Sequence, residues 1–174
     1  MTKTNNGIIV WGIIINDVNL ISEIEHILQP DFGRIVLKSS ATPFNYTDYY
    51  ENEMGKNLNR LWIVTNNFVS LDKIAEIKHY ARKIEDKFRN EQNNRKINLD
   101  PGFLTLSNFV LVTTKNYGHR IYLKNGIYAE VTLIFRNKSF QALEWTYPDY
   151  REAISFFNEV REYYKKIIGD QKKY

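Results

Sequence analysis

Apolar and polar positions in the first hundred residues follow two periods, one typical of strands and one of helices. Residues 8–15 are apolar on both faces and rich in β-branched side chains, which predicts a buried central strand. Shorter apolar runs at residues 34–39, 61–65 and 96–99 predict three further strands. Two helical patterns lie between these runs, so the predicted order of elements is β-α-β-β-α-β.

Polar residues mark where the two helical patterns begin and end. Asp17 can cap the first helix, and Pro30 and Gly33 are expected to end it. Ser70 can cap the second helix. The apolar side of the first helix is predicted to contain Leu20, Ile21, Ile24, Ile27 and Leu28. The residues at helical spacing in the second are Leu71, Ile74, Ala75, Lys78, Ala81, Ile84 and Phe88.

The second half of the chain predicts a buried strand, a β-hairpin and a last helix. The strand is expected at residues 109–114 and the helix at about residues 151–168. Asn125 and Gly126 separate two alternating runs, and both tolerate the positive φ of a two-residue turn. With that turn, His119, Tyr128 and Glu130 are expected on one face of the hairpin.

The same hairpin register places Arg120 on the opposite face, beside Val131. Asp100, Pro101 and Gly102 have the composition of a tight turn, with Pro and Gly at its second and third positions. Residues 41–59 form a connection that is long for a compact domain, which indicates a functional loop or short helical pieces.

These patterns predict an α+β fold whose mainly antiparallel sheet is built on a ferredoxin-like core, with an added hairpin and C-terminal helix. In that arrangement the helices cover one face of the sheet. The chain has 174 residues, no internal repeat and no linker rich in Pro and Gly. Residues 1–174 are therefore expected to form one domain with its own hydrophobic core.

Composition excludes several classes of protein. Hydrophobic residues make up 43% and aromatic residues 14% of the chain, which excludes intrinsic disorder. There is no cysteine, so disulfides and thiolate nucleophiles are excluded. The net charge of +4 is compatible with nucleic acid or anionic metabolites without requiring them. The apolar run at residues 7–15 is too short to span a bilayer and lacks the features of a secretion signal, so no membrane association and a cytoplasmic location are expected.

His119 and Glu130 are expected to lie within reach of each other on the hairpin. A histidine beside a carboxylate can act as a general base with its orienting partner, or both can bind a metal. A structural hydrogen bond on the sheet surface is an equally good interpretation. Asp100, with Asn98 two residues before it, offers oxygen ligands suited to Mg²⁺ or Mn²⁺, although Asp is also favoured at a turn on local grounds. The expected catalytic residues are His119, Glu130 and Asp100, with Asp100 and Glu130 as the expected metal ligands.

Anion binding is expected where the strand at residues 109–114 leaves the sheet. Lys115 follows two threonines there and suits an anionic oxygen, and Arg120 can clamp a phosphate or carboxylate. The alternatives are that Lys115 belongs to an exposed loop and that Arg120 is an edge residue with its charged head in water. The expected ligand-binding residues are Lys115, Arg120, Asn98, Thr114 and Tyr128.

Five segments carry a family resemblance. They are PFNYTDYYENEMG (43–55), NLDPGFL (98–104), TTKN (113–116), HRIYLKNGIYAEVTL (119–133) and WTYPDY (145–150). In these segments the chain resembles an uncharacterised family of bacterial and archaeal domains of unknown function, whose members are sometimes labelled GTP-binding proteins. The resemblance implies a small one-domain protein. The chain has no GxxxxGK motif followed by Ser or Thr, so GTP would have to bind without that phosphate-binding loop.

Two functions are compatible with these observations. The first is recognition, with or without conversion, of a phosphorylated or nucleotide-like ligand, with Mg²⁺ or Mn²⁺ as an optional cofactor. The second is a non-enzymatic module that binds RNA or a protein through its sheet and loops, by analogy with other ferredoxin-like domains. A concave pocket where the polar groups converge would favour the first, and a flat or basic face the second. Because the segments TDYYENEM and WTYPDY combine aromatic with acidic residues, they are expected to pack onto the domain.

Overall fold

The apolar run near the start of the chain forms the centre of a large sheet, as predicted. The computed structural model describes residues 6–170, and their strands form one nine-stranded sheet. Its central strand, β1 (Asn6–Ile15), lies between β4 (Asn59–Ser70) and β5 (Ile97–Leu104) and is antiparallel to both. Ile8 to Ile15 are buried because elements cover both faces of this strand.

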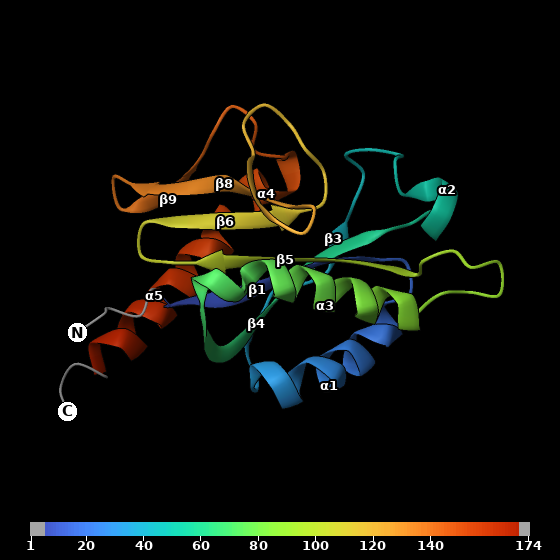
Figure 1. Cartoon of the computed structure of the whole chain (residues 1–174), viewed down its shortest axis with the longest axis horizontal. Helices are drawn as coiled ribbons and strands as arrows, with labels where there is room; N and C mark the ends of the chain where they lie inside the picture. The colour runs from blue at the N-terminus through green and yellow to red at the C-terminus, as the bar shows by residue number, and fades with distance from the viewer. Residues whose placement is uncertain (1–5, 171–174) are drawn as a thin grey trace.

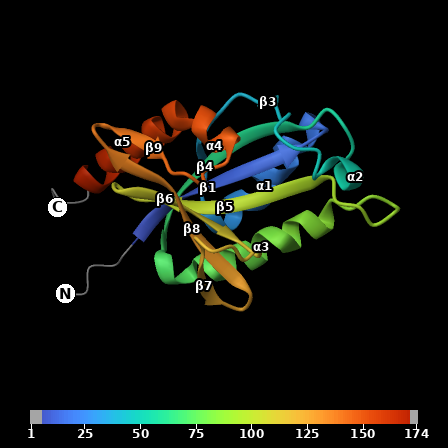
Figure 2. The same ribbon diagram turned by 90° about the horizontal axis from the view of Figure 1, so that it is seen from above.

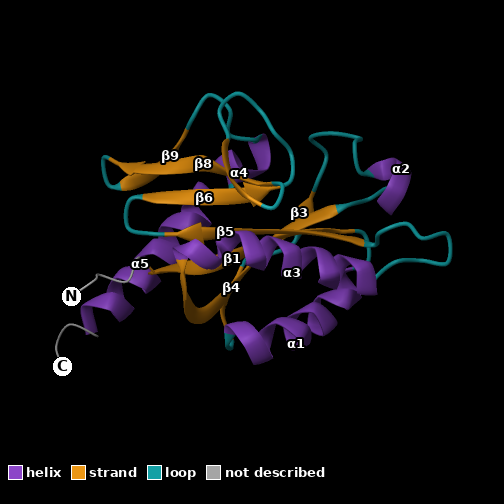
Figure 3. Ribbon diagram, viewed as in Figure 1, coloured by secondary structure: helices purple, strands orange, loops and turns teal. Residues whose placement is uncertain are grey.

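Within the described residues all strand pairings are antiparallel, and the order is β2-β4-β1-β5-β6-β8-β7. Figure 3 shows β4, β1, β5, β6 and β8 of this sheet. β3 also pairs with β4, and β9 with β8. The remaining strands are β2 (Ile35–Lys38), β3 (Thr42–Pro43), β6 (Asn108–Thr113), β7 (Ile121–Lys124), β8 (Ile127–Arg136) and β9 (Ser139–Ala142). The α+β class and the antiparallel sheet are therefore confirmed.

Alternate side chains of β1 contact helices on opposite faces of the sheet. Ile9, Trp11 and Ile13 belong to a core with α1 (Ile21–Phe32) and α3 (Ile74–Lys87). Ile8 and Val10 belong to a second core with α5 (Ile154–Asp170), which begins directly after α4 (Pro148–Glu152). Figures 1 and 2 show α3 on one side of the sheet and α5 on the other. The two helices of the first six predicted elements thus share one face, as expected, and the added C-terminal helix covers the other.

The long connection between β2 and β4 contains short elements, as one of the two interpretations expected. These elements are β3 and α2 (Glu51–Met54). Elsewhere in the chain, two 3₁₀ turns, Val18–Leu20 and Leu71–Lys73, directly precede α1 and α3. The predicted last helix is divided at Ala153 into α4 and α5. No helix within residues 6–170 has the length and apolarity needed to cross a bilayer.

The predicted helix boundaries are correct in part. Asp17 accepts a 3.0 Å hydrogen bond from the backbone N–H of Asn19, so it caps the 3₁₀ turn before α1. Gly33, at φ +84°, directly follows the end of α1. Pro30 lies inside α1, so the prediction that it ends the helix was wrong. The helix continues for two residues because Phe32 is buried in the core.

The predicted turn at Asp100, Pro101 and Gly102 was also wrong, because all three residues lie within β5. Gly102 is required there by packing, since a Cβ at this position would lie 2.3 Å from Cζ of Phe109. Pro101 is tolerated because β6 pairs with β5 only from Gly102 onward, and no described strand needs an N–H from Pro101 on that side. Pro101 thus lies at an edge of β5 without a described partner strand, and Gly102 lies where the Phe109 ring comes close to the backbone.

The hairpin at Asn125 and Gly126 is confirmed, with φ values of +52° and +74° at its turn. Its register differs from the prediction, because an irregularity between Tyr122 and Lys124 pairs Tyr122 with Tyr128 and Ile121 with Ala129. β7 begins only at Ile121, so the two residues before it lie outside the strand. The register predicted by simple alternation therefore does not extend that far.

Candidate functional site

An opening in the sheet between β5 and β6 is the basis of the site. β6 pairs with β5 only at residues 102–104, so residues 97–101 of β5 have no described strand on that side. Side chains of α3 replace the missing strand there. Lys78 Nζ donates to the carbonyl oxygen of Leu99 at 3.2 Å, and Glu85 Oε1 accepts from the Leu99 N–H at 2.7 Å. Both side chains are buried, and they satisfy backbone groups that would otherwise lack partners.

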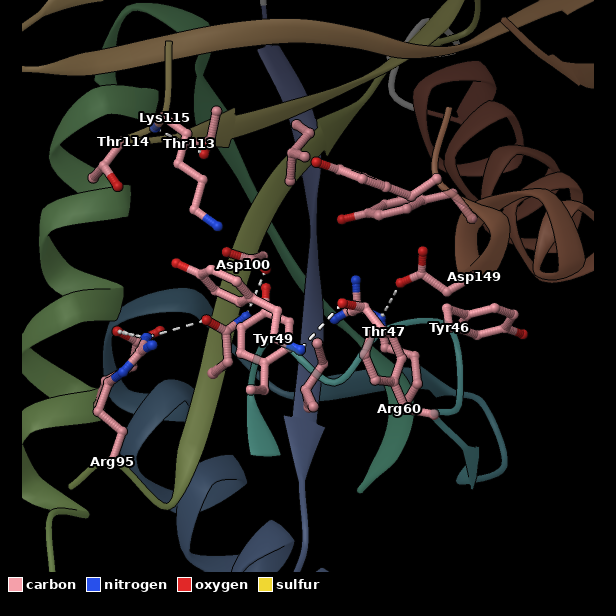
Figure 4. A pocket seen from close by; sticks show the side chains of 18 of the residues that line it. Tyr46, Thr47, Tyr49, Arg60, Arg95, Asp100, Thr113, Thr114, Lys115 and Asp149 are labelled. Atoms are coloured by element: carbon pink, nitrogen blue, oxygen red, sulfur yellow. Dashed lines mark hydrogen bonds and ion pairs between the residues drawn. The ribbon is translucent and has the colours of Figure 1, made fainter. Parts of the chain in front are cut away.

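A cavity of about 510 Å³ lies at this opening (Figure 4). Its walls come from β1, β4, β5, α3, the end of β6 and the segments 44–50 and 147–150. Tyrosines contribute much of the wall, and both aromatic segments that were expected to pack onto the domain lie here. The charged residues in its lining are Arg60, Lys78, Arg82, Glu85, Asp86, Arg89, Arg95, Asp100, Lys115, Arg120 and Asp149.

The floor of the cavity contains the buried guanidinium of Arg60. Arg60 is 4% exposed, lies 4.1 Å above the ring of Trp62, and its Nε is 3.0 Å from Asp149 Oδ2. Gly12 provides the room for this arrangement, because a Cβ there would lie 2.7 Å from Trp62 and 3.1 Å from both Nη atoms of Arg60. Of the buried side-chain atoms in the described part of this floor, Arg60 Nε and Nη1 and the hydroxyl of Tyr150 have no hydrogen-bond partner, although Nε is in the ion pair with Asp149.

Asp100 is held in its ionised form by the groups around it. Lys78 Nζ lies 2.8 Å from its Oδ1, and Asn98 Nδ2 donates to its Oδ2 at 2.7 Å. Burial by itself would raise the pKa of Asp100, but the charges of Lys78 and Arg60 and these two bonds hold that pKa below its usual value. The carboxylate therefore balances the buried charge of Lys78.

Glu85 has the opposite electrostatic balance. Burial raises the pKa of this carboxyl above its ordinary value, although Lys78 and the bond from the Leu99 N–H act against the increase. Arg95 Nη1 lies 3.4 Å from Glu85 and also donates to Asn98, while its other nitrogens bind Glu53. Arg95 is thus committed to partners on the protein.

Two cations of the cavity lining, Lys115 and Arg82, have no carboxylate within ion-pair distance in the described part of the chain. Every other lining cation has one. Lys115 extends from the end of β6 toward Tyr49 and Asp100 (Figure 4), with its Nζ 3.9 Å from the centre of the Tyr49 ring. Arg82 is exposed on α3. The part of the lining that carries Lys115 and Arg82, called the mouth below, therefore has uncompensated positive charge.

Arg120, which lines the cavity, forms a cluster with His119 and Glu130, which do not. Glu130 Oε2 lies 2.9 Å from His119 Nε2 and accepts from Arg120 Nε at 2.8 Å. Contact between His119 and Glu130 is therefore confirmed. The prediction that Arg120 lies on the opposite face was wrong, because residues 119 and 120 precede β7 and turn both side chains toward the same carboxylate.

The expected site residues thus divide into two groups. Asn98, Asp100, Thr114, Lys115 and Arg120 line the cavity, whereas His119, Tyr128 and Glu130 do not. Tyr128 contacts Tyr122 across the hairpin instead.

The expected metal pair of Asp100 and Glu130 is not supported by this arrangement. Asp100 is bonded to Lys78, and Glu130 to Arg120, so each carboxylate already has a cationic partner. No group of three or more His, Asp or Glu side chains within residues 6–170 is arranged to hold a metal ion.

Sequence reasoning missed the residues contributed by α3, β4 and the connection before α2. Lys78 stands at an apolar position of its helix, and Glu85 follows it by seven residues on the same side. Charged residues on an apolar helix face are a signal of buried pairing. Arg60 and Tyr49 carried no comparable signal, because only the packing of β4 and the loop brings them to the cavity.

Comparisons with known proteins supply a family and no function. No match was found among curated proteins or among solved structures. A family model described as a domain of unknown function (DUF4416) matches residues 5–164. This range includes every residue that lines the cavity and nearly the whole chain. The chain therefore belongs to the DUF4416 family of domains of unknown function.

Proposed function

We propose that the cavity binds a small phosphorylated, nucleotide-like ligand. The observation that carries this proposal is the pair of cations at the mouth, Lys115 and Arg82, which lack carboxylate partners among the described residues. The other lining cations are compensated by the protein itself. A phosphate between Lys115 and Arg82 would supply the missing negative charge through charge-assisted hydrogen bonds.

The form of the cavity supports a small ligand over a macromolecule. Its volume of about 510 Å³ lies within the range of about 300–1,000 Å³ that is usual for small-molecule sites. Tyr46, Tyr49 and Tyr50 contribute aromatic surface to one wall, where an uncharged organic part can pack. This concave arrangement favours ligand binding over the alternative of a flat RNA- or protein-binding face.

The proposal concerns binding, and conversion of the ligand stays a hypothesis. Asp100 is the one expected catalytic residue on the described wall, and its carboxylate is bonded to Lys78 and Asn98. A divalent cation would be carried by the phosphate of the ligand, since both expected protein carboxylates have cationic partners. Mg²⁺ and Mn²⁺ therefore belong in the binding test.

We also propose a ferredoxin-like core for the fold. The partial strand order β2-β4-β1-β5 and the position of α1 and α3 on one face support it. In this description β6 to β9, α4 and α5 are additions that cover the second face and form the cavity with the core. The site would then lie between the core and its additions.

The test is a thermal-shift screen of nucleotides and sugar phosphates, with and without Mg²⁺ or Mn²⁺, followed by calorimetry on the hits. Ligands that bind the folded state must raise the melting temperature. Lys115→Ala is expected to weaken binding by about tenfold or more, which is the loss of one charge-assisted bond of about 1.5–3 kcal/mol. Lys83→Ala is the matched control, because Lys83 is an exposed lysine outside the cavity.

Two outcomes contradict the proposal. Equal affinities of the wild type and Lys115→Ala would place the anion elsewhere. Binding of single-stranded RNA but of no nucleotide or sugar phosphate would favour the interaction module instead.

A further inference from the structure

Three buried polar atoms on the cavity floor lack hydrogen-bond partners, although buried polar groups are nearly always hydrogen-bonded. They are Nε and Nη1 of Arg60 and the hydroxyl of Tyr150, in residues that are 4% and 2% exposed. Nε lies 3.0 Å from Asp149 Oδ2 in an ion pair, so Nη1 and the Tyr150 hydroxyl are the two that have neither kind of partner. Both residues line the cavity. Their side chains come from β4 and α4, whereas Lys115 follows the end of β6.

The floor and the mouth are therefore separate parts of one cavity. Three strand spacings of about 4.8 Å each separate β4 from β6 in the sheet. The strand that carries Arg60 and the strand that Lys115 follows are therefore not neighbours in the sheet. The ligand must have a second part if it fills the floor as well.

Charge on the floor decides the chemistry of that second part. Arg60 is paired with Asp149, and Lys78 with Asp100, so the buried cations there are already balanced. A carboxylate or second phosphate on the floor would add a negative charge beside the buried carboxylate of Asp149 and the partly buried one of Asp100, which a low-dielectric site disfavours. An uncharged oxygen adds no such charge.

We propose that the ligand carries an uncharged, hydroxyl-bearing part, as a sugar phosphate does, and that a hydroxyl of this part binds Arg60 and Tyr150. This assignment rests on the proposed function, because it takes the phosphate to lie at Lys115 and Arg82. A hydroxyl has one donor and two acceptor positions. It can accept from Arg60 Nη1 and bond to the Tyr150 hydroxyl at the same time, which completes both missing contacts.

Isothermal titration calorimetry with three probes tests this assignment. All three probes contain a phosphate group. Inorganic phosphate has nothing else, ribose 5-phosphate also has the hydroxyls of a sugar, and 2-phosphoglycolate also has a carboxylate. We expect wild-type protein to bind ribose 5-phosphate about tenfold more tightly than phosphate, the gain from two hydrogen bonds to a neutral group. 2-Phosphoglycolate should bind no more tightly than phosphate.

Tyr150→Phe removes only the hydroxyl and isolates its contribution. We expect this variant to bind inorganic phosphate as the wild type does, with most of the advantage of ribose 5-phosphate lost. Retention of the full advantage, or tighter binding of 2-phosphoglycolate than of ribose 5-phosphate, overturns the assignment. If phosphate binding depends on Lys115 but ribose 5-phosphate binds no more tightly than inorganic phosphate, this inference is overturned and the proposed function is not. Failure of all three probes to bind overturns the proposed function together with it.

Discussion

Arg120 Nη1 donates a 3.0 Å hydrogen bond to the carbonyl oxygen of Lys115. The same guanidinium donates through Nε to the buried carboxylate of Glu130 at 2.8 Å. Arg120 thereby links the backbone of Lys115 to the buried ion pair that it forms with Glu130. Arg120, expected from the sequence to bind an anion itself, is better placed to position Lys115.

Replacement of Arg120 should destabilise the protein strongly. Arg120 and Glu130 have side chains that are 2% and 0% exposed, and Arg120→Ala leaves the Glu130 charge buried without its cation. We expect a loss of about 3–5 kcal/mol in the free energy of unfolding, measured by urea denaturation. Lys124→Ala is the control, since the Lys124–Glu76 pair is about half exposed and should contribute less than about 1 kcal/mol. Similar losses in both variants would show that the buried pair has no special role.

Tyr150→Phe should leave the free protein as stable as the wild type or make it more stable. The hydroxyl is buried without a hydrogen-bond partner, so its removal relieves a desolvation cost of about 1–3 kcal/mol. Tyr164→Phe is a matched comparison, because the buried Tyr164 donates a 2.9 Å bond to the carbonyl oxygen of Asn6. That variant should lose about 1 kcal/mol. Thermal denaturation of the two variants without ligand measures these changes in stability. A clear loss of stability in Tyr150→Phe would show that the Tyr150 hydroxyl has a hydrogen-bond partner in the free protein.

Asp100→Asn should cost stability at neutral pH and less under acidic conditions. The pKa of Asp100 is lowered in the folded state, so its ionised form favours folding above the unfolded pKa of about 3.9. That contribution is lost as the pH falls below about 3.9 through the folded pKa. Urea titrations of both proteins at a series of pH values should therefore give a difference that shrinks on acidification. A difference independent of pH would mean that the Asp100 charge is not what stabilises the site.

Glu85→Gln should show the reverse trend, since burial raises the folded pKa of Glu85. A raised pKa favours folding below the unfolded pKa of about 4.3, and the benefit is lost as the pH rises through the folded value. The amide stays neutral throughout and keeps an oxygen for the Leu99 N–H. The stability of the wild type relative to this variant should thus decrease as the pH rises above about 4.3. The same series of urea titrations measures it, and an increase instead would contradict the raised pKa.

Gly102→Ala should destabilise the sheet, because the new Cβ would lie 2.3 Å from the Phe109 ring and 2.7 Å from the carbonyl oxygen of Val110. Such overpacking costs about 1–3 kcal/mol, to be measured by thermal or urea unfolding. Gly118→Ala is the control, since no atom lies within 4 Å of its Cβ position. Its effect should stay within about 0.5 kcal/mol. If Gly102→Ala were as stable as Gly118→Ala, the packing of the Phe109 ring would not require a glycine at position 102.

Local features of the fold could be predicted because they depend on neighbouring residues. The period of apolar residues identified β1 and α3, and Asn125-Gly126 identified the hairpin turn with its positive φ angles. Contact between His119 and Glu130 followed from the same hairpin, although the register was shifted. Such patterns act over a few residues, so no knowledge of distant contacts was needed.

The sequence by itself determined the central strand, the helices α1 and α3, the hairpin turn and the antiparallel character of the sheet. Tertiary structure decided that Pro101 and Gly102 extend a strand, and that Lys78 and Arg60 line one cavity with Asp100. The physical reason is that β5 and β6 separate after three paired residues, which exposes backbone groups that only a helix distant in sequence can satisfy. A local pattern contains no information on which distant charges will meet at such an opening.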